Sequence, residues 1–277
     1  MSKKDFKANF HILTFRTRLK KCFGEALWLR VFLADPHHGI LHGNRVRKGC
    51  LKLMQKMEVA ELSKLKKEGQ KIDSKNPLAS AIEAVEIAAL FHDCGRFNDA
   101  GEVKFEEQGK HHELSAARTK VFCQHFGFLK ALPFVEEAVL CHDFNSQKTT
   151  PHLKPPKSMI GKLVQASDQI GWFHPGSVQR TLAYNINLKI PFFDPTFDLT
   201  TRLNWKIHVQ SLDAITVLMH QLFGSCKADR FGVKAAREKI ETYKEQLEKK
   251  ILQAAHKHGV KKEIQELIED FRRQEKN

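Results

Sequence analysis

The sequence predicts an all-α protein, and two observations support this. Apolar residues recur every three or four positions in most segments, which is the period of an amphipathic helix, while alternating strand-like patterns are scarce. Gly and Pro gather in short stretches between the periodic segments, as expected of turns. The 277 residues contain no internal repeat and can form one large domain or two small ones.

The expected helices follow one another along the chain. The first runs over 13–33, and the turn Asp35-Pro-His-His-Gly39 separates it from the second at 41–57. The polar stretch 64–76 is expected to be a helix end followed by a loop. The remaining helices are expected at 78–94, 112–126, 133–143, 158–172, 204–223, 228–257 and 261–273.

The composition changes near Cys226, where densely mixed charge begins. Beyond this point two apolar helical stripes can be followed: Ile240, Tyr243, Leu247 and Ile251 in the first, and Ile264, Leu267, Ile268 and Phe271 in the second. We therefore predict a domain over 1–225 and a helical extension over 226–277. The extension is expected to pack on that domain or on a partner subunit, as in a homodimer.

The formal net charge is +14, and residues 1–76 hold 18 Lys or Arg against 7 Asp or Glu. A basic surface attracts phosphate-rich partners and anionic substrates. Nucleic-acid binding is nevertheless not favoured over a role in solubility, because no recognised nucleic-acid module accompanies the charge. The six cysteines lack the paired spacing of a zinc ribbon, which is typical of reduced thiols in the cytosol. No apolar stretch is long enough to span a membrane, so a cytoplasmic protein without membrane contact is expected.

Four histidines and two aspartates lie on the apolar faces of the expected helices. His92 continues a buried face at helical spacing, and Asp93 beside it can reach into the same cavity because Gly95 ends the turn. By the same helical spacing, four more side chains are predicted to point toward the core: His42, His111, His142 and Asp168. One such residue is usually a hydrogen-bonded core group, but six together are better explained by a shared metal site. Imidazole and carboxylate groups are both common metal ligands.

Five short motifs carry a family resemblance. They are His42-Gly-Asn-Arg-Val46, Ala88-Ala-Leu-Phe-His-Asp-Cys-Gly95, His111-His-Glu-Leu-Ser-Ala116, Val139-Leu-Cys-His142 and Gln165-Ala-Ser-Asp168. In this order they resemble the HD-domain superfamily of metal-dependent phosphohydrolases. The resemblance implies an HD-domain helical bundle, here with a C-terminal helical extension.

By this resemblance, His42, His92, Asp93 and Asp168 hold one divalent metal ion. His111 and His142 complete a second site, with Asp93 as the bridging and catalytic carboxylate. The implied cofactors are two ions, most often iron or manganese, and magnesium, nickel or cobalt in other members. Mixed imidazole and carboxylate ligands suit Mn²⁺ and Fe²⁺ on chemical grounds as well.

The sequence departs from the superfamily in several places. Arg96 stands where many relatives have lysine, which keeps the positive charge and adds a fork suited to phosphate. The Gly-Tyr-Pro signature of cyclic-dinucleotide hydrolases and the Glu-Asp pair of guanosine-tetraphosphate hydrolases are absent, so both identities are disfavoured. The 50-residue spacing from His42 to His92 is long for the superfamily and predicts an insertion at 58–76.

The implied activity is hydrolysis of a phosphomonoester or phosphodiester, in a small nucleotide-like substrate, by a metal-activated water at a mono- or binuclear centre. Arg45 and Arg96 are expected to bind the phosphoryl oxygens, with a surface or capping role as the alternative for each. His112 and Glu113 are candidates for supporting the ligands. His37 and His38 could also support them, but an exposed turn is the favoured interpretation for these two histidines. Two other functions stay open: a di-iron oxygenase of the HD type, and a non-catalytic module that binds nucleic acid or another ligand.

Overall fold

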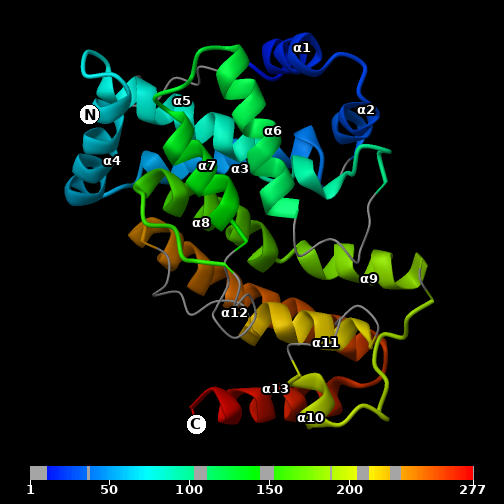
Figure 1. The fold of residues 1–277 in the computed structure, drawn as a ribbon. Coiled ribbons are helices and arrows are strands. Elements are labelled where there is room, and N and C mark those ends of the chain that lie inside the picture. Colours follow the sequence, from blue (N-terminus) through cyan, green and yellow to red (C-terminus); the bar gives the residue numbers. More distant parts are fainter. Residues whose placement is uncertain are drawn as a thin grey trace. The chain divides into compact units, whose positions relative to one another are not determined.

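The computed structural model describes residues 11–35, 38–102, 111–143, 153–187, 189–204, 212–224 and 232–276 (Figure 1). Within these ranges every regular element is a helix and no strand occurs, so the predicted all-α class is confirmed. None of the helices described is long and apolar enough to cross a membrane.

The chain forms two compact units, which are described separately. Unit 1 contains Met1–Phe144, Leu153–Asp168 and Phe231–Ala236, and unit 2 contains Asn145–His152, Gln169–Arg230 and Arg237–Asn277. The division into a hydrolase domain over 1–225 and a helical extension over 226–277 stays a prediction.

Unit 1 is built around α5 (Pro77–Phe91). This helix packs against α3 (Ile40–Met54), α4 (Val59–Ile72), α6 (His111–His125) and α7 (Leu132–Cys141). It starts at Pro77, a residue that suits the first helical turn, and it is buried on nearly all sides because its residues are largely apolar. The first part of α8 (Met159–Phe173), through Asp168, also belongs to this unit.

Aromatic packing fixes the C-terminal end of α5. The ring of Phe91 lies 5.4 Å from that of Phe15 and 4.9 Å from that of Phe122, measured between centroids. All three rings are fully buried. Since Phe91 directly precedes His92, this cluster of rings from three helices anchors the part of the backbone that carries the first predicted ligand pair.

The predicted helix 13–33 is two helices. α1 (Ile12–Phe23) ends at Gly24, whose φ of +62° is a left-handed conformation that favours glycine, and α2 (Leu27–Ala34) starts after a short turn. The apolar pattern continues across the break because Phe23 and Trp28 pack together on its two sides, with ring centroids 5.0 Å apart.

The predicted loop in 64–76 is instead largely the helix α4. Glu58 and Glu61 form a capping box at its start, and the helix continues to Ile72. Only Leu65 and Gly69 are buried on it, which is why the sequence shows no clear apolar stripe there. The predicted insertion is therefore a helix that packs on α5.

Unit 2 contains α9 (Ser177–Asn187), α10 (Leu199–Arg202), α11 (Ala214–Met219) with a π-helical turn at His220–Gly224, and α13 (Lys261–Lys276). It also contains α12 (Lys234–Lys257) from Arg237 onward. Its core includes the predicted stripe residues Leu247, Ile251, Ile264, Leu267, Ile268 and Phe271. The C-terminal stripes thus pack within their own unit, and a homodimer through these helices stays a prediction. The helices α9 and α10 had no counterpart among the expected elements.

Candidate metal centre

All six predicted ligands converge in unit 1. They come from five helices: His42 from α3, His92 and Asp93 from the end of α5, His111 from the start of α6, His142 from the end of α7, and Asp168 from α8. Two groups, His42–His92–Asp168 and His92–Asp93–His142, each place one ligand atom per residue within 4.8 Å of the others.

Backbone carbonyls orient two of the imidazole rings. Nδ1 of His92 lies 2.8 Å from the carbonyl oxygen of Ala89, and Nδ1 of His142 lies 2.7 Å from that of Val139. In the tautomer that donates from Nδ1, the Nε2 atom of each ring carries a lone pair directed at the centre. A carbonyl that holds the outer ring nitrogen is a common support for a metal-binding histidine.

The distances in the first group suit ligands of one ion. Nε2 of His42 lies 3.1 Å from Oδ1 of Asp168 and 3.1 Å from Nε2 of His92. Neighbouring ligands at right angles, each about 2.1 Å from an ion, are roughly 3.0 Å apart. The residues therefore fit a divalent cation in both donor type and spacing.

The two oxygens of Asp93 face different sets of histidines. Oδ2 lies 3.6 Å from Nε2 of His42 and 3.5 Å from Nε2 of His92. Oδ1 lies 3.6 Å from Nε2 of His111 and 3.4 Å from Nε2 of His142, and these two rings approach to 3.3 Å. Each oxygen of Asp93 thus lies within 3.6 Å of two imidazole nitrogens.

Burial and opposite charge shift the pKa values in this centre. Burial alone would lower the pKa of His92, but Asp93 and Asp168 raise it to about 9. Burial would raise the pKa of both carboxyl groups, yet Arg96 and His92 hold that of Asp93 far below its usual value, and contacts with His42 and His92 do so for Asp168. Burial lowers the pKa of His42 despite the opposing effect of Asp168. The carboxylates are thus ionised at neutral pH.

These shifts predict a pH dependence of metal binding. With a pKa of about 9, His92 holds a proton near neutral pH that an ion must displace. We expect the affinity for Mn²⁺ to rise by up to about tenfold per pH unit between roughly pH 7 and 9. Calorimetric titration in two buffers of different ionisation enthalpy measures both the affinity and the released proton. An affinity that stays constant over this range would contradict the assignment of His92 as a ligand.

The same shift has a consequence for the metal-free protein. Because the pKa of His92 is raised on folding, its charged form stabilises the fold fully below about pH 6.5, and this contribution is lost as the pH rises through about 9. Metal binding removes the need for that proton, so the ion should stabilise the protein most at alkaline pH.

For His38 the sequence favoured an exposed turn over contact with the ligands, and the structure shows such a contact. The side chain of His38 is 44% exposed, but Nδ1 lies 3.0 Å from Oδ2 of Asp93. The backbone N–H of His38 donates to Oδ1 of Asp35 at 2.6 Å, which fixes the turn ahead of α3. A residue in a turn has no helical periodicity, so no apolar face could have revealed it. His37 lies outside the described residues.

Arg96 contacts the centre through Asp93. Its Nε donates to Oδ1 of Asp93 at 2.7 Å, and although burial alone would lower the pKa of Arg96, that carboxylate raises it. Arg45 is exposed on α3, one turn after His42. Binding of substrate phosphate by the two arginines stays a prediction.

The two residues expected to orient the ligands are His112 and Glu113, both in the first turn of α6. The ring of His112 is buried and lies 5.6 Å from that of His111, while Glu113 is exposed. Their supporting roles stay predictions. Arg118, also on α6, donates to the carbonyls of Cys94 and Phe97 and so clamps the chain that follows Asp93.

One family model matches this part of the chain. It is described as the SidE phosphodiesterase (PDE) domain and matches residues 31–173, a range that contains the six predicted ligands and His38. No curated protein and no solved structure matched the chain.

The match corrects the resemblance drawn from the sequence. Assignment to the HD-domain superfamily is wrong, because the family model that matches is the SidE phosphodiesterase domain and not an HD family. The motifs behind that assignment are short sets of histidine and aspartate on helices. Such motifs indicate side chains that could bind a metal, and unrelated families can contain the same side chains. The HD-type oxygenase alternative loses its basis along with the resemblance.

Proposed function

The chain belongs to the SidE phosphodiesterase (PDE) domain family, and we propose that it hydrolyses phosphodiesters with divalent metal ions held in unit 1. Family membership supports an enzyme that hydrolyses phosphodiesters in general, rather than a non-catalytic module. The metal dependence, the residues involved and a small nucleotide-like substrate are our proposals.

The observation that carries the proposal is the buried convergence of imidazole nitrogens and carboxylate oxygens at the spacing of metal ligands. Nε2 of His92 faces Nε2 of His42, and Nε2 of His142 faces Oδ1 of Asp93, while both Nδ1 atoms are already engaged by carbonyls. Neutral rings in this arrangement would leave acceptors facing acceptors in a buried space, so in the metal-free protein a proton on His92 separates them. A divalent cation can replace that proton and offset the charge of both acids, and a histidine-rich centre with two acids suits Mn²⁺ or Fe²⁺.

We assign the following roles to the residues of the site. His42, His92 and Asp168 would hold one ion, and His111 and His142 a second, with Asp93 shared between them. When bound, such ions lower the pKa of a coordinated water and offset negative charge on the phosphoryl oxygens. Arg96 keeps Asp93 ionised and in place through its Nε, and the rest of its guanidinium can bind an anionic oxygen of the substrate.

His38 is suited to proton transfer. Its Nδ1 is held by Asp93 and its ring is nearly half exposed, so Nε2 can face a substrate from the solvent side. We propose that Nε2 of His38 donates a proton to the leaving oxygen as the ester bond breaks.

The test of the proposed function uses bis(p-nitrophenyl) phosphate and a panel of dinucleotides. Hydrolysis is expected to disappear after chelation and to return on reloading with Mn²⁺ or Fe²⁺, with two ions per chain by elemental analysis. Hydrolysis that survives complete removal of metal would refute metal dependence. Turnover of the activated ester without any dinucleotide turnover would remove only the nucleotide-like substrate from the proposal.

Replacing His38 by Gln tests its role through the leaving group. Loss of a general acid should lower kcat by about a hundredfold for an ester with an alkoxide leaving group, since such a proton transfer typically contributes about 10²-fold or more. An ester that releases p-nitrophenolate needs no proton and should lose far less. Metal content should be unchanged, and His125→Gln, an exposed histidine on α6, provides the control. Equal losses on both esters would show that His38 acts only by positioning Asp93.

A further inference from the structure

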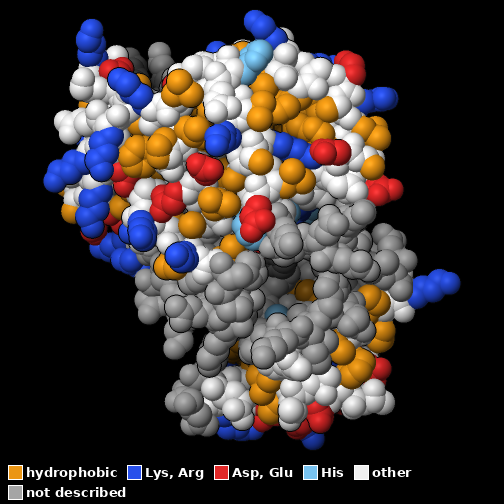
Figure 2. All heavy atoms as spheres, in the orientation of Figure 1, with side chains coloured by type: hydrophobic (Ala, Val, Ile, Leu, Met, Phe, Trp, Pro, Cys, Tyr) orange, Lys and Arg blue, Asp and Glu red, His pale blue; other side chains and the backbone are white. Residues whose placement is uncertain are grey.

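A second charged feature of unit 1 is a pocket formed by α4 and the start of α8. Its volume is about 230 Å³, and five lysines line it: Lys64, Lys67, Lys71, Lys157 and Lys162. The first three share one face of α4, since they are spaced by three and four residues. Figure 2 shows basic side chains gathered on the side of the molecule where α4 lies. Glu68 and Met159 complete the lining.

The pocket is separate from the metal centre. Met159 begins α8 and Asp168 follows nine residues later on the same helix, which is a distance of roughly 13 Å along the axis. None of the predicted metal ligands lines the pocket.

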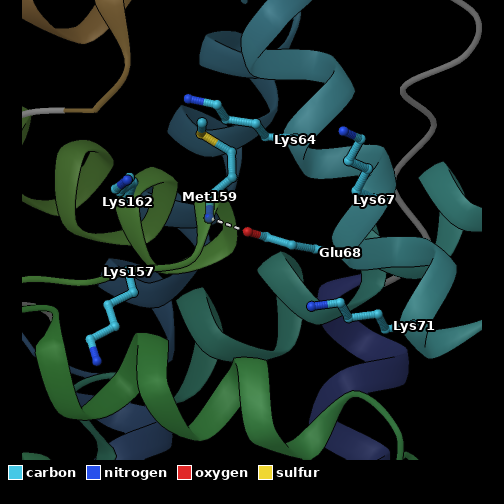
Figure 3. Close-up of a pocket in the computed structure, with 7 residues that line it drawn as sticks. All are labelled: Lys64, Lys67, Glu68, Lys71, Lys157, Met159 and Lys162. Atoms are coloured by element: carbon cyan, nitrogen blue, oxygen red, sulfur yellow. Dashed lines mark hydrogen bonds between the residues drawn. The ribbon is translucent and has the colours of Figure 1, made fainter.

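One anionic group already occupies part of the pocket. Oε1 of Glu68 accepts a hydrogen bond from the backbone N–H of Met159 at 2.7 Å, and Oε2 accepts one from Ile160 at 3.1 Å. Figure 3 shows Glu68 extending from α4 to the backbone of Met159, with the lysines around it. The first amides of α8 thus hold a carboxylate, as helix N-termini often hold anions.

The lysines outnumber the carboxylates among the lining residues. None of the five ammonium groups forms an ion pair within the described part of the chain, and Glu68 is the one carboxylate among the lining residues. The other acids at the start of α4 are engaged elsewhere, since Glu61 accepts from the backbone of Lys234 and Glu58 pairs with its ammonium group. Like charges at these spacings destabilise α4, and a bound anion would relieve that repulsion.

We propose that this pocket binds a compact polyphosphate group, either as a free molecule or as the phosphorylated headgroup of a lipid. Its volume of about 230 Å³ is that of roughly eight water molecules, which is room for a few phosphates but not for a folded segment. Lysine binds phosphate as a point charge from several directions, so five of them around a hollow suit clustered phosphates better than one carboxylate.

The experiment compares two charge reversals on α4 in the full chain, with tripolyphosphate as the probe. Lys67→Glu reverses a lining residue, while Lys66→Glu makes the same change at an exposed neighbour about 100° around the helix, outside the pocket. By calorimetry the wild type should bind one tripolyphosphate, Lys67→Glu should weaken binding by at least about tenfold, and Lys66→Glu by less than about twofold.

Two further variants test the other charged groups of the pocket lining. Lys157→Glu, on the segment before α8, should weaken binding as Lys67→Glu does. Glu68→Gln removes the one carboxylate of the lining and should strengthen binding severalfold, while thermal stability in the absence of the ligand falls because a cap of α8 is weakened. A purely structural role of these residues predicts no gain of affinity.

Vesicles of phosphatidylcholine, with and without phosphorylated phosphatidylinositol, distinguish the two sources of the polyphosphate. Binding to the phosphorylated vesicles that is lost in Lys67→Glu and retained in Lys66→Glu would support the headgroup, and binding of tripolyphosphate alone the free molecule. Absence of saturable binding to both probes would overturn the proposal. So would equal effects of the two reversals, which would indicate general charge attraction or binding at the metal centre. Binding of single-stranded RNA to the pocket, without binding of tripolyphosphate or phosphorylated vesicles, would also overturn the proposal.

Discussion

Replacing Asp93 by Asn should remove both metal ions and lower kcat/KM for phosphodiesters by about three orders of magnitude. The carboxylate offers one oxygen to His42 and His92 and the other to His111 and His142. An amide of the same shape keeps one oxygen and places N–H donors where the other acceptor was. Losing a single group that stabilises transition-state charge typically costs about 10²- to 10³-fold, and here two ions would depend on one residue.

Elemental analysis and steady-state kinetics measure this outcome. The matched control is Asp99→Asn, which removes one negative charge from the same connecting segment at a side chain that is 90% exposed and paired with Arg118. It should leave metal content unchanged and kcat/KM within about twofold. An Asp93→Asn protein that still holds two ions, with a native circular dichroism spectrum, would rule out a bridging role.

The sequence was most informative where the ligands lie on helical faces. His42, His92 and Asp168 each continue an apolar stripe, so burial of the stripe dictates the direction of the side chain. Three helices that pack through such faces must bring these side chains together, and the distances show that they do. The same reasoning applied to His111 and His142, which meet at 3.3 Å.

The sequence was least informative where tertiary contacts, and not helical periodicity, determine the conformation. His38 reaches Asp93 from a turn, and α4 buries too few residues to show a stripe. The break at Gly24 interrupts a pattern that stays apolar because the flanking aromatic residues pack across it. The family assignment failed for a further reason: a metal site constrains a few ligand positions, and these say little about the ancestry of the scaffold.

Gly95→Ala should destabilise unit 1 by about 3 kcal/mol and disrupt half of the metal centre. A Cβ at this position would lie 2.1 Å from the carbonyl oxygen of His111 and 2.5 Å from the backbone nitrogen of Ser115. Both are backbone atoms in the first turns of α6, so the clash is relieved only by moving the helix. The hydrogen bond from the Gly95 N–H to Oγ of Ser115, 2.7 Å long, would be strained as well. Overpacking of this kind commonly costs about 1–3 kcal/mol, and the rigid neighbours place this case at the upper end.

The displacement of α6 should affect only part of the metal centre, because His111 is the one predicted ligand on that helix. Its Nε2 lies 3.3 Å from that of His142 and 3.6 Å from Asp93, so a shift of an ångström or more separates this ligand from its group. His42, His92 and Asp168 come from other helices and should still bind, so the content should fall from two ions to one. Denaturant unfolding and elemental analysis test both parts, with Gly171→Ala as the control, since a Cβ there has no atom within 4 Å. Gly171→Ala should raise the free energy of unfolding by about 0.5–1 kcal/mol, because alanine favours a helix more than glycine does. A similar rise in Gly95→Ala would show that the position of α6 does not depend on the absence of a side chain at residue 95.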